Sequence, residues 1–183
     1  CHNIRITNNT IYNGSNIWEY EGDPTHTNLI ILDACQNGPT IRCFPNLYGF
    51  YGILVNEKTN DTVIENNKAY NNNGTGIYIT GWLPVTVRNN IVYNNTYAGI
   101  QVDYKNTPYN TGWRTYNTGH HVIENNIAYD NTYDLLLNGV YNVTLRNNTL
   151  NHSSTGINVT DCNGTIRLFY NQITTTSSII PEI

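Results

Sequence analysis

The chain has little charge, no methionine and few of the residues that favour helices. Charged residues make up 12% of the sequence and the net charge is -4 at pH 7. This leaves no basic stripe suited to nucleic acid, so we expect no nucleic-acid partner. No apolar run approaches the length of about 18 residues that a membrane span requires. No secretion signal remains either, so Cys1 is interpreted as a processed or cut end.

Asparagine is abundant in place of these residues. The sequence contains 33 Asn and 29 Ser plus Thr, a composition that favours turns over helices. Its ten N-x-S/T sequons are about twice the number expected by chance, which favours an exported glycoprotein. The alternative is that Asn-rich turns create sequons by accident. The predicted glycosylation sites are Asn8, Asn13, Asn60, Asn73, Asn94, Asn142, Asn151, Asn158 and Asn163.

One segment, residues 63–80, recurs along the chain. Copies begin at Val85, His121 and Val143, and weaker copies begin at Ile4 and Ile166. Each full copy contains an Asn-Asn pair, and the first Asn of successive pairs is separated by 23, 36 and 22 residues. A period in the low twenties, built from short β-branched alternations between Asn and Gly, is typical of one turn of a β-solenoid.

With these repeats, the sequence resembles the right-handed parallel β-helix repeat family, which includes pectate-lyase-like, NosD-like and surface-layer proteins. The resemblance implies an all-β fold, a right-handed parallel β-helix, and the length accommodates about seven coils in a single domain over residues 1–183. Two segments depart from the repeat, at about 16–50 and 103–120, and are predicted to be loop insertions. One degenerate coil is also predicted between Asn8 and Asn66. Since the family includes lyases, epimerases, adhesins and structural proteins, it does not define one activity.

Stacking the repeats produces columns of equivalent residues. The first Asn of each pair is predicted to point inward and to hydrogen-bond along the stack. This makes Asn147, the tenth sequon, unsuited to a sugar. The predicted inward apolar residues are Ile4, Ile6, Ile11, Val63, Ala69, Ile77, Ile79, Val85, Val87, Val92, Ile100 and Val102.

Two outward columns are also predicted. Glu65, Arg88, Glu124 and Arg146 alternate in charge, which favours a salt-bridge ladder over catalytic carboxylates. The second column contains four tyrosines. Three roles remain open for these rings: stiffening the rod, binding sugar faces, or burial against another molecule. The four are Tyr12, Tyr70, Tyr93 and Tyr129.

The insertions carry the candidate ligand-binding residues, because an aromatic and basic loop on a rigid scaffold suits a binding site. These residues are Tyr104, Lys105, Trp113 and Arg114. Other titratable residues considered for an enzyme are Glu19, Glu21, Asp23, His26, Asp33, Asp103, His120 and His121. None has metal-ligand spacing, and the absence of Met disfavours the copper binding that the NosD resemblance suggests. We therefore predict no metal, no cofactor and no catalytic residue.

The two ends of the chain are in phase with each other. If a second copy followed directly, Asn171 would lie 21 residues before its Asn9, and Cys162 would lie 22 residues before its Cys1. Each separation is close to one coil, so head-to-tail copies would continue the solenoid, unless the match is a coincidence or the sequence is an excerpt. We predict an intermolecular Cys162–Cys1 disulfide and an internal Cys35–Cys43 disulfide, with buried thiols as the alternative for the latter pair.

The resulting hypothesis is a structural subunit of an extracellular, glycosylated filament or surface layer, whose partners are copies of itself. The alternatives are a carbohydrate-binding adhesin module and a polysaccharide lyase or epimerase that uses the insertions.

Overall fold

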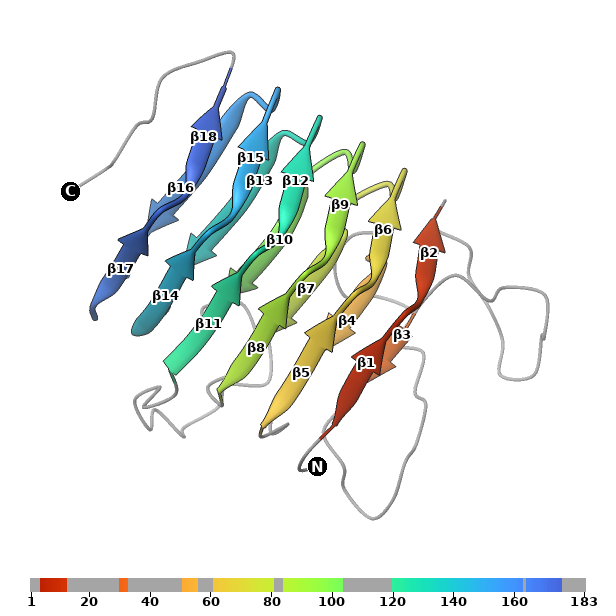
Figure 1. The fold of residues 1–183 in the computed structure, drawn as a ribbon, viewed down its shortest axis with the longest axis horizontal. Helices are drawn as coiled ribbons and strands as arrows, with labels where there is room; N and C mark the ends of the chain where they lie inside the picture. The colour runs from red at the N-terminus through yellow and green to blue at the C-terminus, as the bar shows by residue number, and fades with distance from the viewer. Residues whose placement is uncertain are drawn as a thin grey trace.

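The computed structural model describes residues 4–12, 30–32, 51–55, 61–80, 84–103, 120–162 and 164–175. Within these ranges every regular element is a β-strand, and the 18 strands form three parallel sheets of six. Each sheet forms one side of a rod, and the levels follow the chain from one end to the other (Figure 1). The predicted all-β parallel β-helix is therefore confirmed.

Each complete coil contributes one strand to each sheet. Sheet I contains β1 (Arg5–Thr7), β5 (Thr62–Glu65), β8 (Val85–Arg88), β11 (His120–Glu124), β14 (Asn142–Arg146) and β17 (Ile166–Phe169). Sheet II contains β2 (Thr10–Tyr12), β6 (Lys68–Tyr70), β9 (Ile91–Tyr93), β12 (Ile127–Tyr129), β15 (Thr149–Asn151) and β18 (Gln172–Thr174). Sheet III contains β3 (Ile30–Leu32), β4 (Ile53–Val55), β7 (Ile77–Thr80), β10 (Ala98–Asp103), β13 (Tyr133–Asn138) and β16 (Thr155–Thr160).

Sheet III begins one level before the other two. Strand β1 pairs directly with β5, and β2 pairs directly with β6. No complete level therefore separates these strands, and of the degenerate coil predicted between Asn8 and Asn66 the described residues contain a single additional strand. Only β3 is added, beside β4 at the edge of sheet III. Most of the predicted insertions, residues 16–29, 33–50 and 104–119, lie outside the described residues.

The inward side chains form apolar columns along the rod. In sheet I, Ile64, Val87, Ile123 and Leu145 lie one above the other and are fully buried. Burial of each such side chain contributes about 2 kcal/mol. The inward predictions hold for Ile6, Ile11, Ala69, Ile77, Ile79, Val85, Val87, Val92, Ile100 and Val102, all buried, whereas Ile4 is half-buried.

Val63 is a correction to the predicted core. Val85 pairs with Thr62 rather than with Val63, so alternation places Thr62 and Ile64 inward. Val63 is half-buried in the outward column. Val63 precedes the first Asn of its pair by three residues and Val85 precedes its own by four, and a one-residue shift exchanges the two faces of a strand.

The Asn pairs form the turn between sheets I and II, and here the prediction was wrong by one residue. The first Asn of each pair has a positive φ, 56° at Asn66 and 55° at Asn89, and is exposed at the turn. Asn tolerates this left-handed conformation, which reverses the chain direction. The second Asn therefore points inward, and Asn67, Asn90 and Asn126 are almost completely buried.

These inward Asn side chains form a continuous hydrogen-bonded ladder. The Nδ2 of Asn90 donates to Oδ1 of Asn126 at 3.0 Å and to the Ile64 carbonyl at 2.9 Å. Its Oδ1 accepts from the backbone N–H and the Nδ2 of Asn67, at 2.9 and 3.1 Å. The pattern runs from Asn9 to Asn171. It satisfies backbone groups inside the turn that no strand reaches.

The turn between sheets II and III has the same arrangement of an outward Asn followed by an inward Asn. Asn71 and Asn94 have positive φ, and the residues that follow them, Asn72 and Asn95, are buried. The Nδ2 of Asn72 donates to Oδ1 of Asn95 at 2.8 Å, and that of Asn95 to Oδ1 of Asn131 at 3.1 Å. Two internal Asn ladders therefore tie adjacent coils together.

Replacing one ladder residue should destabilise the rod strongly. Asn90→Ala removes the acceptor of two Asn67 donors and the donor to Ile64, which leaves buried polar groups without partners. We expect a loss of ~3 kcal/mol or more, measured by urea denaturation. The matched control is Asn89→Gly, because glycine accepts the φ of 55° at this turn position. Equal losses in the two variants would contradict the assignment of the ladder to the second Asn.

Candidate functional site

Many of the predicted site residues lie outside the described part of the chain. These are the candidate ligand-binding residues Tyr104, Lys105, Trp113 and Arg114, the cysteines Cys1, Cys35 and Cys43, the sequons Asn13, Asn60 and Asn163, and the titratable residues Glu19, Glu21, Asp23, His26 and Asp33. The described candidates lie on the outer faces of the three sheets, in the core of the fourth coil, and at the C-terminal end of the stack. The fourth coil is the one formed by β11, β12 and β13.

The outer face of sheet I carries the predicted charge ladder. Strand pairing places Glu65 opposite Arg88 and Glu124 opposite Arg146. The closest nitrogen–oxygen distances are 2.6 Å for the first pair and 2.5 Å for the second. Arg5 also pairs with Glu65, and Arg5 and Arg88 together hold the pKa of that carboxyl below its ordinary value. Both carboxylates are thus held in ion pairs, as expected of a structural ladder.

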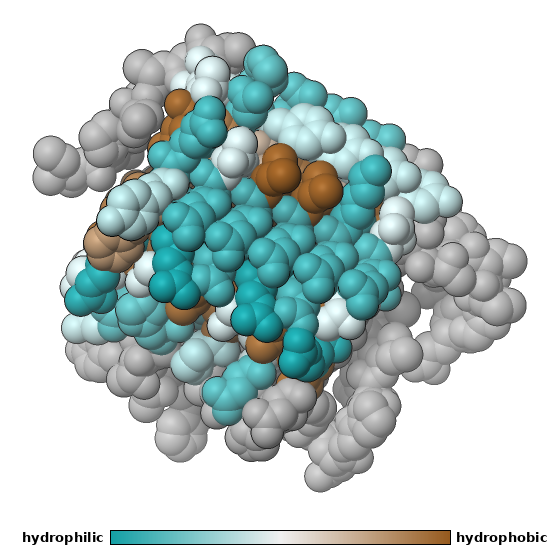
Figure 2. Space-filling view, viewed as in Figure 1, coloured by the Kyte–Doolittle hydropathy of each residue, from teal (hydrophilic) through white to brown (hydrophobic). Residues whose placement is uncertain are grey.

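The outer face of sheet II carries the predicted tyrosine column. Tyr12, Tyr70, Tyr93 and Tyr129 stack with ring centroids 5.3, 4.9 and 4.7 Å apart and interplanar angles of 13°, 1° and 3°. The Lys68 ammonium lies 5.2 Å from the Tyr70 centroid, and its hydrogen bond to Tyr93 raises the pKa of Lys68. This side of the rod is mainly hydrophilic, with a small apolar spot over β9 and β12 (Figure 2).

Stacking determines which part of each tyrosine a ligand can reach. Between neighbouring rings the flat faces cover each other, so only the edges, the hydroxyl groups and the two ends of the stack remain accessible. Sugars bind aromatic residues mainly through the ring face. Of the three roles left open for this column, the geometry therefore disfavours sugar binding.

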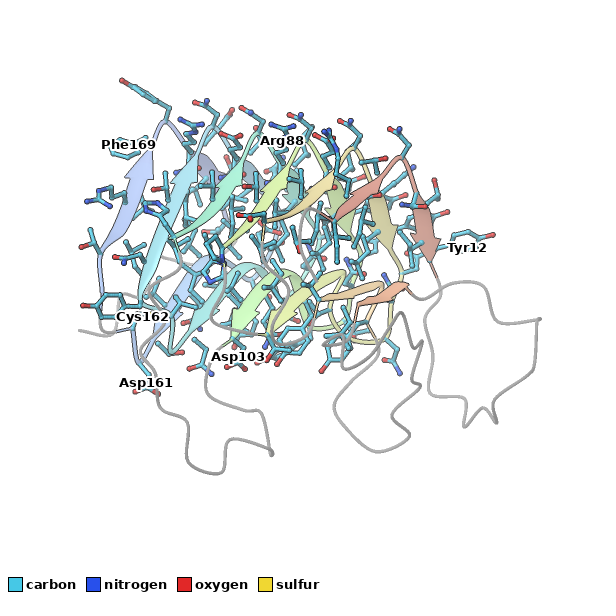
Figure 3. All side chains as sticks on the ribbon, turned by 90° about the horizontal axis from the view of Figure 1, so that it is seen from below. Tyr12, Arg88, Asp103, Asp161, Cys162 and Phe169 are labelled. Carbon is cyan, nitrogen blue, oxygen red and sulfur yellow. The ribbon has the colours of Figure 1, made fainter. Side chains whose placement is uncertain are left out.

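The outer face of sheet III carries a buried polar cluster around Asp103. Asp103 is labelled in Figure 3. Its carboxylate accepts from the Tyr78 hydroxyl at 3.5 Å and from the Asn138 amide at 3.3 Å. Burial is the main cause that raises the pKa of Tyr78, so this phenol stays protonated. Sequence reasoning selected Asp103 because of its charge and missed Tyr78, whose burial no local pattern indicated. Among the described residues the cluster has one carboxylate and no basic group.

The core of the fourth coil contains a buried carboxylic acid that sequence reasoning missed. Asp134 occupies the column position of Gly76 and Gly99, and its side chain is completely buried. The hydroxyl of Ser153 and the Nδ2 of Asn131 both donate to its Oδ1, the latter at 3.0 Å. Desolvation raises its pKa from 3.8 to about 7.

In the preceding coils, the positions of Asp134 and Ser153 are occupied by a Gly and by an Asn of the next coil. A Cβ placed at Gly99 would lie 2.9 Å from the Nδ2 of Asn131, so glycine makes room for the ladder Asn of the next coil. Where Asp replaces this Gly, the next ladder residue is the smaller Ser153. Both residues of the pair are therefore exchanged at this place, and the carboxyl group accepts the Asn131 hydrogen bond in place of the missing amide.

A double-mutant cycle tests this exchange. In Asp134→Gly/Ser153→Asn, the new Asn can accept from Asn131 as other ladder residues do. Ser153→Asn alone crowds Asp134, and Asp134→Gly alone removes an acceptor from Asn131. We expect the double variant to be more stable than the sum of the single changes by about 1 to 3 kcal/mol, measured by urea denaturation at one pH. A coupling energy near zero would show that the two positions are independent.

His121 is a second buried titratable group in the same coil. It lies in the inward column between Val85 and Val143, with its side chain fully buried, while its neighbour His120 is exposed. Desolvation lowers the pKa of His121 from 6.5 to about 4. The two histidines point to opposite faces of β11, as their adjacency predicts, and do not form a joint site.

Asp134 and His121 should give opposite dependences of stability on pH. The folded pKa of His121 is lowered, so its contribution to stability is lost as pH falls from 6.5 to about 4. The folded pKa of Asp134 is raised, so its contribution is lost as pH rises from 3.8 to about 7. Across their overlap each slope is about 1.4 kcal/mol per pH unit, and the two nearly cancel.

Single variants should reveal the two slopes. Relative to the wild type, Asp134→Asn should gain stability as pH rises from 4 to 7, and His121→Val should gain stability as pH falls from 6.5 to 4. The quantity to measure is the difference in unfolding free energy between variant and wild type at several pH values, in which all other groups cancel. A pH-independent difference for either variant would contradict the corresponding pKa shift.

The described sequons differ in exposure. Asn8, Asn73, Asn94 and Asn147 are exposed, whereas Asn142, Asn151 and Asn158 are half-buried. Asn147 was predicted to point inward and so to be unsuited to a sugar. This prediction is wrong, because Asn147 is the first Asn of its pair and points outward. Glycosylation itself stays a prediction at every sequon.

Cys162 is the one cysteine among the described residues, and its thiol is free. The side chain is half-buried and packs against the apolar core at the C-terminal end of the rod (Figure 3). Its Sγ donates to the Thr160 carbonyl at 3.3 Å, and burial raises the pKa of the thiol. The predicted bond to Cys1 of another copy stays a prediction.

The described residues contain no group of three or more His, Cys, Asp or Glu arranged to hold a metal ion. The part of the chain that can be described also has no helix with the length and apolar character needed to cross a membrane.

A family model described as a right handed beta helix region matches residues 1–111, which is more than half of the 183-residue chain. No curated protein and no solved structure matches the chain.

Proposed function

Since the chain belongs to the right-handed β-helix family, in which different functions are built on one scaffold, we propose that it is a structural subunit of an extracellular, glycosylated filament or surface layer. Copies stack head-to-tail through the ends of the β-helix. The observation that carries this proposal is the complementarity between the two ends of the described stack.

The Asn ladder has a direction, and its ends differ in hydrogen-bonding character. Each ladder Asn donates to Oδ1 of the Asn in the next coil, from Asn9 donating to Asn67 through to Asn148 donating to Asn171. At the N-terminal end of the ladder, Asn9 therefore offers its Oδ1 as an acceptor. At the C-terminal end, Asn171 offers amide donors, and no described ladder residue lies beyond it. A second copy placed at the C-terminal end would bring its Asn9 oxygen to the donors of Asn171 and continue the ladder.

The sheets are also stepped in a complementary way. At the N-terminal side, sheet III has one additional strand, β3. At the C-terminal side, sheets I and II each have one strand, β17 and β18, beyond the level of the last described strand of sheet III, β16. In a head-to-tail stack, β3 of the next copy would lie beside β16 and complete the level that β17 and β18 begin. All three sheets would then continue in phase.

Apolar side chains are exposed at the same C-terminal level. Leu168 belongs to the inward column of Leu145, which is fully buried, but Leu168 is 52% exposed. Phe169 beside it is 46% exposed, and it lies at the opposite end of the rod from Tyr12 (Figure 3). A stacked copy would cover Leu168 with the start of its own apolar columns and add the favourable free energy of burying this surface.

Export and glycosylation are part of the same proposal. Four sequon asparagines on outward turns, Asn8, Asn73, Asn94 and Asn147, are exposed to a modifying enzyme. None of them lies on the apolar columns that would meet at a junction. The proposed Cys162–Cys1 disulfide would link copies covalently, which requires the oxidising environment of an exported protein.

A charge placed on the open core column should block stacking. Leu168→Lys leaves the ammonium in water in a single rod, but would bury it without a partner in a stack. Burying the unpaired charge costs ~3 kcal/mol or more, which weakens association at least about 100-fold. The matched control is Gln172→Lys, which adds the same charge at the same level but on the outward face of β18. Sedimentation velocity and electron microscopy would measure the length of the rods.

Three outcomes separate the possibilities. Stacking through this end is supported if the wild type and Gln172→Lys form rods while Leu168→Lys remains a single molecule. A non-reducing gel ladder that Cys1→Ser abolishes supports the disulfide in addition. A wild-type protein that stays monomeric at high concentration overturns the filament proposal.

A further inference from the structure

The tyrosine ladder on sheet II places four oxidisable phenols in contact with one another. Tyr12, Tyr70, Tyr93 and Tyr129 occupy one register column on β2, β6, β9 and β12. The pairs Tyr70–Tyr93 and Tyr93–Tyr129 are nearly parallel, with centroids 4.9 and 4.7 Å apart. The strand spacing of the sheet therefore holds neighbouring rings at contact distance in the folded protein.

The reactive parts of these rings are accessible. The faces are covered by stacking, but Tyr12 is 40% exposed and the other three are half-buried on an outer face of the rod. The ring edges carry the hydroxyl groups and the carbon atoms ortho to them. These are the atoms at which phenols lose an electron and a proton and then form bonds.

We propose that the tyrosine ladder is a site of oxidative cross-linking, in which neighbouring coils of the same chain are joined through dityrosine. The co-reactant is a one-electron oxidant of the haem peroxidase class with hydrogen peroxide. Each of two adjacent phenols loses one electron and one proton to give a phenoxyl radical. The radicals couple through a carbon–carbon bond between ortho positions, and the two ortho hydrogens move to the phenol oxygens. The two electrons and two protons removed reduce one hydrogen peroxide to two waters.

The cross-link would have a structural consequence similar to that of a disulfide. It would tie residues 23 or 36 positions apart in the sequence, as in Tyr70–Tyr93 and Tyr93–Tyr129. Closing a loop of this size reduces the conformational freedom of the unfolded chain. The fold would therefore resist unfolding more strongly after oxidation, without any change in the stacking of its strands.

This inference does not depend on head-to-tail assembly. The two levels after Tyr129 in the same column are occupied by Asn151 and Thr174. A copy stacked at the C-terminal end would bring its Tyr12 next to Thr174 rather than next to a tyrosine. The expected cross-links are consequently within one chain, whether or not the chain forms filaments.

The test is treatment of the purified, folded chain with a haem peroxidase and hydrogen peroxide. Dityrosine fluorescence should appear in the monomer band of a denaturing, reducing gel. Intact mass should fall by two hydrogens for each cross-link, and tandem mass spectrometry should identify joined peptides that contain adjacent ladder residues. Urea denaturation of the oxidised monomer should show a higher midpoint than that of the untreated protein.

Variants distinguish the ladder from other tyrosines. Tyr93→Phe keeps a stacked ring but cannot form a phenoxyl radical, so it should remove the Tyr70–Tyr93 and Tyr93–Tyr129 cross-links and leave only Tyr12–Tyr70. Tyr170→Phe is the matched control, because Tyr170 is 89% exposed and lies outside the ladder. The edge-on pair Tyr97–Tyr133, at 5.5 Å and 78°, provides an internal comparison that should cross-link less than the stacked pairs.

Two results would overturn the proposal. One is dityrosine found mainly between chains and lost in Tyr170→Phe. The other is a yield of ladder cross-links that is the same in the folded protein and in urea, since random encounters would then explain them.

Discussion

The internal Asn ladders are the interaction on which the rest of the structure depends. A coil of this size must turn sharply between sheets, and backbone groups on the inside of the turn cannot reach a strand partner. The side chain of Asn90 meets this requirement by bonding to Ile64 and Arg88 carbonyls and to the ladder residues on both sides. Because an amide has both donors and an acceptor, the same residue can repeat in every coil without leaving a buried polar group unpaired.

This constraint determines what the outer surface can carry. Each inward Asn is preceded by a residue with positive φ that points outward, so the turns display exposed Asn side chains such as Asn8 and Asn94. The strands between turns bring the side chains at equivalent positions of successive coils into contact, which creates both the Glu/Arg ladder of sheet I and the tyrosine ladder of sheet II. Surface chemistry on this rod is therefore repeated along its axis rather than gathered in one cleft.

The fourth coil and the coil after it show how much departure the ladder tolerates. Asp134 and Ser153 replace the Gly and Asn of other coils, and His121 replaces an aliphatic core residue. Both titratable groups are held in their neutral forms near pH 5 to 6 by desolvation. The same coil carries two opposite pKa shifts, so the cost of one group rises as that of the other falls.

The period, the parallel β-helix, the tyrosine column and the Glu/Arg column could all be predicted from the sequence, because side-chain alternation and repeat length are local properties. The inward Asn could not be identified in this way, since the choice between Asn66 and Asn67 depends on which of them adopts the left-handed conformation at the turn. The environment of Asp134 also required the tertiary structure. Its partner Ser153 lies 19 residues away and belongs to the next coil, so only the stacking of coils brings the hydroxyl and the carboxyl group together and removes both from water.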